Sequence, residues 1–202
     1  MHLADGVINV PTIAATYAGT AALVGYGIGK IKEEEIPKIS LMTGTFFAVS
    51  LISIPVGPSS IHPLIAGLIG VMLGKRAPVA IFIGLLFQAL LFQHGGLTTL
   101  GANTLMLAIP ALLSHTLYQR IKGDNAMKKG MIVGATATIM SVILLVAVLV
   151  TSQPLFAQGA ASVVNLIIIG HIPLVVIEAF VTGSALQLIM KSRPNWITGG
   201  GH

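Results

Sequence analysis

The second residue of the chain places an imidazole beside the amino terminus, and the two together can bind a metal ion. The α-amine of Met1, the amide nitrogen of the peptide bond to His2, and Nδ1 of the His2 ring can close two fused chelate rings around one ion. Because the peptide group is planar, the three nitrogens form a roughly planar set. Such coordination suits Ni(II) or Cu(II), whereas magnesium and calcium are poor candidates to displace an amide proton. One further nitrogen would complete a square plane around the ion.

Two other histidines are candidates for the fourth donor. We favour His62, because Pro63 restricts the backbone that follows and a Gly-Pro pair at 57–58 shapes the turn before it, which presents the ring at a helix start. Two glycines follow His94 and let its backbone come close to the site, so we expect His94 to orient the loop or the ligands. Asp5 is expected to turn the arm and to accept a hydrogen bond from a ligating histidine.

The elements that must position these histidines are membrane spans. Hydrophobic residues make up 54% of the chain and charged residues only 8%, whereas a soluble domain carries about 25% charged residues. The predicted fold class is an all-α, polytopic membrane bundle of seven transmembrane helices. The predicted spans are residues 11–30, 38–54, 61–74, 77–93, 99–119, 130–152 and 163–189.

The positions of the eleven lysines and arginines indicate the orientation of this bundle. With seven spans, all eleven fall on one face, and the loops of the opposite face contain none. Because basic residues collect on the cytoplasmic side, we expect the N-terminus to be extracellular and the C-terminus cytoplasmic. Six or eight spans would break this separation. The net charge of +5 therefore reflects membrane orientation, and no nucleic-acid partner is expected.

The expected organisation is a single membrane domain over residues 1–202. Residues 1–10 form an extracellular N-terminal metal-binding arm, residues 11–189 form the seven-helix bundle, and residues 190–202 form a cytoplasmic tail. The first 11 residues contain no lysine or arginine, which argues against a signal peptide. Residue 1 is therefore expected to be the mature N-terminus.

Glu178 is the only acidic residue deep inside a predicted span. Two roles remain open for it: a hydrogen bond between helices, which we favour, and part of a conformational relay. A self-sufficient channel or secondary transporter would need several polar groups across the membrane, whereas Glu178 stands almost alone. An intramembrane metalloenzyme would need a carboxylate base near the metal, and only Asp5 lies on the outer face. The residues therefore argue against both of these classes of protein.

Three segments of the first half carry a resemblance to a known family. In chain order they are MHLADG, GPSSIHPLIAGLIGVMLGK and FQALLFQHGGLTTLGANT. They resemble the NikM/CbiM family, the membrane-embedded substrate-binding S components of energy-coupling factor transporters for nickel and cobalt. The chain has MHLADG where MHIPDG or MHIMEG is commoner, and it keeps the histidine and the acidic position. The resemblance implies that the metal ligands are Met1, His2 and His62, surrounded by Asp5, Ser60, His94 and Asn103.

The resemblance also implies cargo, partners and location. The bound substrate would be Ni(II), with Co(II) as the alternative, since a planar nitrogen set fits d8 Ni(II) better. The partners would be a membrane coupling (T) subunit, a pair of cytoplasmic ATPases and often a small accessory membrane subunit, together with membrane lipid. The chain has no complete nucleotide-binding motif, because residues 70–76 are too short for a phosphate-binding loop. It would therefore act without its own ATPase activity, in the cytoplasmic membrane of a prokaryote.

Overall fold

Seven helices of eight or more residues make up most of the chain that the structure describes, which comprises residues 3–52, 54–56, 59–159 and 162–198. In this computed structural model they are α1 (Val10–Ile28), α2 (Ile36–Ser50), α3 (Ala66–Leu73), α4 (Ala77–Phe92), α5 (Leu100–Arg120), α6 (Ala126–Ser152) and α7 (Val163–Ser192). Shorter elements are η1 (Glu33–Glu35), β1 (Ile54–Val56), β2 (Ser59–Ile61), η2 (Gly74–Arg76), η3 (Pro154–Ala157) and α8 (Asn195–Thr198).

Polar side chains cap the starts of three helices. Asn9 precedes α1 and accepts a hydrogen bond from the amide of Thr12 at 3.0 Å. Asn125 and Ser162 do the same for α6 and α7, each through the amide three residues further on. These residue types are the ones that helix N-termini favour, because their oxygens satisfy an amide that has no intrahelical partner. The cap at Asn125 starts α6 earlier than residue 130, where the hydrophobic segment was expected to begin.

The all-α fold class is confirmed. Four helical stretches of the described chain are long and apolar enough to cross a membrane. They are Ala66–Phe92, which comprises α3, η2 and α4, and the helices Leu100–Arg120, Ala126–Ser152 and Val163–Ser192.

The prediction of a helix over residues 61–74 is wrong at its start. The chain first forms a hairpin, in which β2 pairs antiparallel with β1, and α3 begins only at Ala66. Pro63 has no amide hydrogen to donate, and Ile65 lies in the left-handed region with φ 42°. The predicted span 38–54 likewise ends early, because α2 stops at Ser50 and the apolar residues that follow enter the hairpin.

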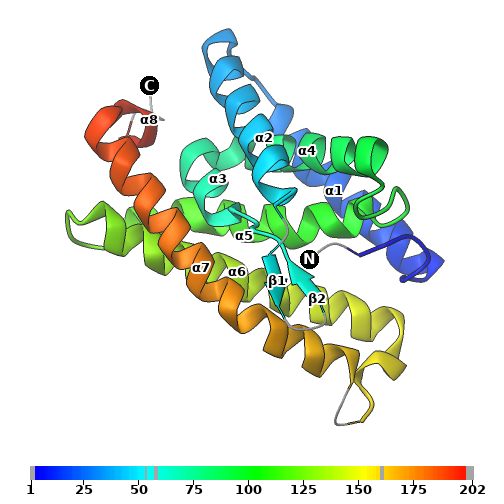
Figure 1. Cartoon of the computed structure of the whole chain (residues 1–202). Coiled ribbons are helices and arrows are strands. Elements are labelled where there is room, and N and C mark those ends of the chain that lie inside the picture. Colours follow the sequence, from blue (N-terminus) through cyan, green and yellow to red (C-terminus); the bar gives the residue numbers. More distant parts are fainter. Residues whose placement is uncertain (1–2, 53, 57–58, 160–161, 199–202) are drawn as a thin grey trace.

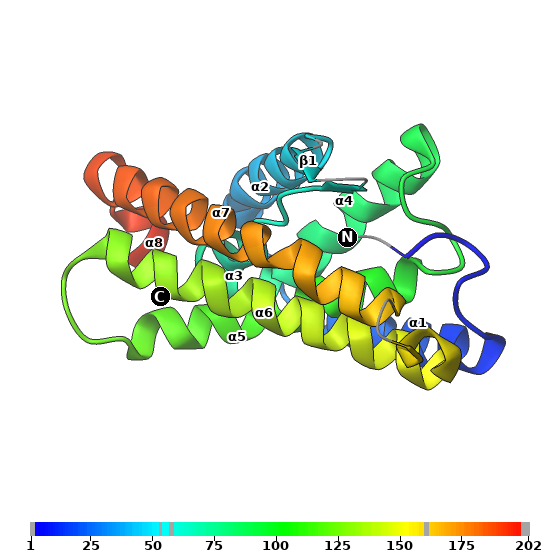
Figure 2. The same ribbon diagram turned by 60° about the horizontal axis from the view of Figure 1, so that its bottom comes forward.

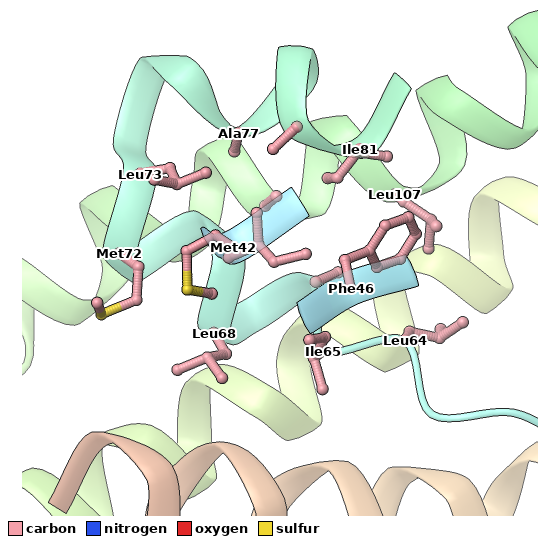
Figure 3. Packing of buried hydrophobic residues seen from close by; sticks show 14 of the residues in the cluster. Met42, Phe46, Leu64, Ile65, Leu68, Met72, Leu73, Ala77, Ile81 and Leu107 are labelled. Atoms are coloured by element: carbon pink, nitrogen blue, oxygen red, sulfur yellow. The ribbon is translucent and has the colours of Figure 1, made fainter. Parts of the chain in front are cut away.

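The longest helices form one layer and the shorter helices lie against it. Figures 1 and 2 show α5, α6 and α7 side by side, and α6 contacts both α5 and α7. Helix α3 packs on α5 and α6, while α2 packs on α4. The core between these helices contains Phe46, Leu64, Ile65, Ile81 and Leu107, all buried (Figure 3). The α7 helix also exposes large apolar side chains, as a lipid-facing surface would.

A buried arginine connects the segments at the end of the bundle that was predicted to be cytoplasmic. Arg76 is 3% exposed, and its side chain donates to the carbonyls of Gly27, Gly29 and Lys30, each at 2.7 Å. Its Nε and Nη2 also donate to the carboxylate of Glu35, at 3.0 and 2.7 Å. These bonds from Arg76 lower the pKa of the Glu35 carboxyl to about 2. The buried charge is thus paired, as burial of an ion requires.

Close helix contact depends on a glycine where α3 crosses α5. A Cβ atom built on Gly70 would lie 1.9 Å from the backbone oxygen of Ala111. The two backbones therefore touch, as small residues allow in helix pairs that lie in lipid.

We expect the substitution Gly70→Ala to destabilise the bundle by about 1–3 kcal/mol, because α3 and α5 must separate to admit the methyl group. Thermal unfolding in detergent, followed by circular dichroism, measures this loss. The matched control is Gly25→Ala in the exposed part of α1, where an added Cβ meets nothing within 4 Å. That variant should be as stable as the parent or more so, since alanine favours the helix. Equal stability of both variants would contradict the close contact.

Candidate metal site

Two histidines that lie far apart in the sequence come together at one end of the bundle. His62 follows β2, and His94 follows α4. Their ring centroids are 4.7 Å apart, and the ring planes meet at 74°. Nδ1 of His62 is buried and has no hydrogen-bond partner within the described ranges of the chain. Since buried polar atoms are normally satisfied, this nitrogen is open to an additional group such as a metal ion.

The end of α4 determines the position of His94. Gln93 closes the helix in the left-handed conformation, with φ 52°, and the amide of His94 donates to the carbonyl of Gln88 at 3.1 Å. The buried side-chain amide of Gln88 in turn donates to the hydroxyl of Ser50 at the end of α2. This polar contact therefore joins α2 to α4, and the backbone of the same Gln88 is bonded to His94.

The surroundings of both histidines favour the neutral imidazole. Burial lowers the pKa of His62, although the nearby backbone carbonyls of Ile52 and Ser50 act in the opposite direction. Burial also lowers the pKa of His94, and the adjacent His62 lowers it further. A neutral imidazole is the form that donates its lone pair to a metal. Both rings are thus suited to bind or to surround a cation near neutral pH.

A pair of hydrogen bonds holds the N-terminal arm against α5. Oδ1 of Asn103 accepts from the amide of Leu3 at 2.8 Å, and Nδ2 of Asn103 donates to the Leu3 carbonyl at 3.0 Å. The hydroxyl of Thr99 donates to the same carbonyl at 2.6 Å. Leu3, Asn103 and Thr99 are all buried. The predicted ligands Met1 and His2 lie outside the described residues, so the structure fixes the arm from Leu3 onward.

Asp5 connects the arm to the loop that follows His94. Its Oδ1 accepts from the amide and the hydroxyl of Thr98, at 2.8 and 2.6 Å. These bonds lower the pKa of the Asp5 carboxyl. A Cβ on Gly96 would lie 2.2 Å from Asp5 Oδ1, so only glycine fits there. Asp5 was expected to accept a bond from a ligating histidine; among the described residues, its side-chain hydrogen bonds are to Thr98.

The far end of the arm is bonded to α6. The amide of Asn9 donates to Oγ of Ser152 at 2.7 Å, and its side chain donates to the Ser152 carbonyl at 3.0 Å. Ile8 is buried in a small cluster with Met106 and Leu149. The arm is therefore bonded at both ends to long helices.

Ser60, which was predicted to lie near the metal, contributes its backbone to the hairpin, where it is paired with Pro55.

Other histidines of the described chain have different surroundings. Nδ1 of His171, in α7, lies 2.6 Å from the carbonyl of Ile167. His115, in α5, lies 3.0 Å from the Gln119 side-chain nitrogen. Within the described ranges, no group of three or more His, Cys, Asp and Glu side chains could hold a metal ion. A complete site therefore needs donors beyond these, such as the amine, amide and imidazole of the first two residues.

Sequence reasoning missed two features of this site. It did not identify Thr99, whose bond to Leu3 supports the arm, and it did not find a partner for Glu178. The carboxylate of Glu178 accepts backbone hydrogen bonds from Leu64 and Ile65, just after His62. The adjacent threonines at 98–99 were a visible signal, but nothing local indicated which segment Glu178 would contact.

Comparison with known sequences shows the family to which this chain belongs. The family model CbiM, described as cobalt uptake substrate-specific transmembrane region, matches residues 2–196. A cobalt transport protein CbiM of Thermosipho melanesiensis is 31% identical over 208 residues, covering 96% of this chain and 88% of the relative. A fused nickel transport protein NikMN of Rhodobacter capsulatus is 30% identical over 173 residues, covering 80% of this chain and 50% of the relative.

A solved structure has the same fold. The crystal structure of a transition metal transporter superposes with a TM-score of 0.76 at 22% identity, and the match covers 95% of this chain and 93% of the other. The resemblance in the three sequence segments is confirmed by the family match over nearly the whole chain. The protein is thus a multi-pass transport component and not an enzyme. It belongs to the CbiM/NikM family of cobalt and nickel uptake transmembrane components.

Proposed function

We propose that this chain captures Ni(II) outside the membrane for ATP-driven uptake by a complex with partner subunits. The ion would be held in a plane by the amine of Met1, the amide nitrogen of the peptide bond to His2, the imidazole of His2 and the imidazole of His62. The observation that carries this proposal is the buried Nδ1 of His62, which has no hydrogen-bond partner in the described chain and belongs to a ring that packs against His94. Burial lowers the pKa of His62 and so favours the neutral imidazole, which is the form that binds a metal.

The anchored arm supports a role for the first two residues. Asn103 bonds both polar backbone groups of Leu3, the residue that directly follows His2. Asp5 and Asn9 hold the rest of the arm through Thr98 and Ser152. Preorganisation of this kind reduces the ordering cost of binding. Asn103, Asp5, Ser60 and His94 would then orient the ligands and the loops that carry them.

Nickel is preferred to cobalt because of the donor set. The terminal amine, the planar amide beside it, the His2 imidazole and one further imidazole give the planar nitrogen field that d8 Ni(II) favours. The family description names cobalt uptake, and the Rhodobacter capsulatus relative is named for nickel. Cobalt is therefore the alternative substrate, and direct competition between Ni(II) and Co(II) for the purified protein separates the two.

We propose seven spans with the arm (residues 1–10) outside, the bundle over residues 11–189 and a cytoplasmic tail over residues 190–202. The segregation of lysine and arginine residues supports this orientation. The fused Rhodobacter relative, twice the matched length, supports association with further transporter subunits. These would be a membrane coupling subunit, a cytoplasmic ATPase pair and a small accessory membrane subunit. A stand-alone channel or secondary transporter would instead support uptake in vesicles without the ATPase subunits.

The substitution His62→Ala should abolish tight Ni(II) binding, because it removes one of four ligands. The loss should exceed the roughly 10- to 100-fold that a missing supporting hydrogen bond costs at a metal site. Isothermal titration of the purified protein with Ni(II) measures it, and circular dichroism checks the fold. His115→Ala, in the C-terminal part of α5 and away from His94, is the matched control and should bind like the parent. Stoichiometric, tight nickel in His62→Ala would exclude His62 as a ligand.

A short peptide extension before Met1 should also abolish Ni(II) binding, because it converts the terminal amine into an amide. Visible absorption spectroscopy of the nickel-loaded protein should show loss of the band of planar Ni(II). The same peptide placed after His202 is the control and should leave the band unchanged. Unchanged affinity with the N-terminal extension would show that the amine is not a ligand.

The affinity for Ni(II) should rise by at least about tenfold per pH unit above pH 6.5, because binding displaces the amide proton and the proton of the terminal amine. His62 should add nothing to this slope, since its pKa lies below the ordinary value of 6.5 and its ring is already neutral. Titrations at several pH values, in buffers of different ionisation enthalpy, count the released protons. An affinity that is independent of pH in this range would argue against amide coordination.

A further inference from the structure

Glu178, in α7, places its carboxylate against the backbone that follows His62. Its Oε1 accepts hydrogen bonds from the amides of Leu64 and Ile65, the latter at 3.0 Å, and Oε2 lies 3.1 Å from the Ile65 amide. The Glu178 residue is 1% exposed, and Leu64 and Ile65 are equally buried. The contact spans more than a hundred positions of sequence, so it joins the last long helix to the beginning of α3.

The backbone after His62 needs this acceptor. Pro63 has no amide hydrogen, and Ile65 adopts φ 42° and ψ 23°, a conformation that a β-branched residue rarely takes. Ile65 is the N-cap residue of α3, and its own side chain makes no capping bond. Glu178 therefore supplies, from another helix, the acceptor for the two amides just before α3, where a carboxylate is also favoured by the helix dipole. Without it, two buried amides would lose their acceptor.

His62 thus lies between two fixed segments. Before it, β2 is paired with β1 in the hairpin. After it, the Glu178 bonds begin only two residues away. The ring itself packs against His94. Glu178 has little freedom to shift, because the backbone of α7 touches α6 there: a Cβ on Gly134 would lie 2.5 Å from the Glu178 carbonyl oxygen.

We propose that Glu178 is a positioning residue of the metal site: through the amides of Leu64 and Ile65 it sets where the His62 ring presents its nitrogen. This inference rests on the proposed function, in which His62 is a ligand. Glu178 touches no metal in this role. Its loss displaces a ligand without removing one, and therefore changes the geometry of bound Ni(II) as well as the affinity.

The test compares Glu178→Leu, Glu178→Gln and Thr182→Val in the full chain. Leucine removes both acceptors, whereas glutamine keeps one carbonyl oxygen. Thr182 lies one turn further along α7, is buried, and its hydroxyl has no hydrogen-bond partner among the described residues, so Thr182→Val is the matched control. Each protein is titrated with Ni(II), and the visible band of the bound ion is recorded together with the melting temperature of the metal-free protein.

We expect Glu178→Leu to weaken Ni(II) binding at least about tenfold and to shift the visible band. Glu178→Gln should restore part of the affinity and most of the band, and Thr182→Val should match the parent in both. A purely structural role would lower the melting temperature and leave affinity and band unchanged; that result overturns the proposal. If the leucine variant does not fold, a glutamine variant identical to Thr182→Val in affinity and band overturns it as well.

Failure of this inference is separable from failure of the proposed function. If the parent binds Ni(II) and His62→Ala does not, while the Glu178 variants bind like the parent, only the positioning role is lost. If the parent protein binds no Ni(II), the proposed function itself fails.

Discussion

The structure depends on hydrogen bonds that buried polar side chains make to backbone groups outside the regular helices. In an apolar bundle, a polar backbone group outside a helix has no water to bond and needs a protein partner. Asn103 provides one for Leu3 in the arm, and Glu178 provides one for Leu64 and Ile65. At the opposite end, Arg76 donates to three carbonyls in the last turn of α1 and just after it. Polar side chains from other parts of the chain thereby hold each of these irregular segments in place.

This arrangement would let a membrane bundle support the proposed metal site on its loops. Loops carry most binding residues in proteins, but they need a rigid scaffold to present them. Here Asn103 of α5 and Glu178 of α7 hold the residues that come just after the proposed ligands in the chain. The contact of His62 with His94 brings a third segment, the end of α4, to the same place. In the proposed planar site, this rigidity would keep the donors in place around the ion.

Much of the helical architecture follows from hydropathy alone. The spans predicted at 99–119 and 163–189 correspond closely to α5 and α7, because long apolar runs with polar caps have few alternatives. The hairpin at Ile54–Ile61 was not predicted. Its residues continue the apolar run of α2, and a short apolar run does not distinguish a strand from a helix. Pro63 was correctly placed near a helix start, but the left-handed Ile65 delays that start to Ala66.

What the sequence determined by itself is the chemistry that is local to a few residues. An amine, an amide and an imidazole at positions 1 and 2 are neighbours through covalent bonds, so their joint chelating capacity needs no fold. The composition likewise determined a membrane bundle. Only the tertiary structure decided that His62 meets His94, that Asn103 holds Leu3 and that Glu178 supports Leu64. These partners are separated by long stretches of chain, and which of them meet depends on how the helices pack.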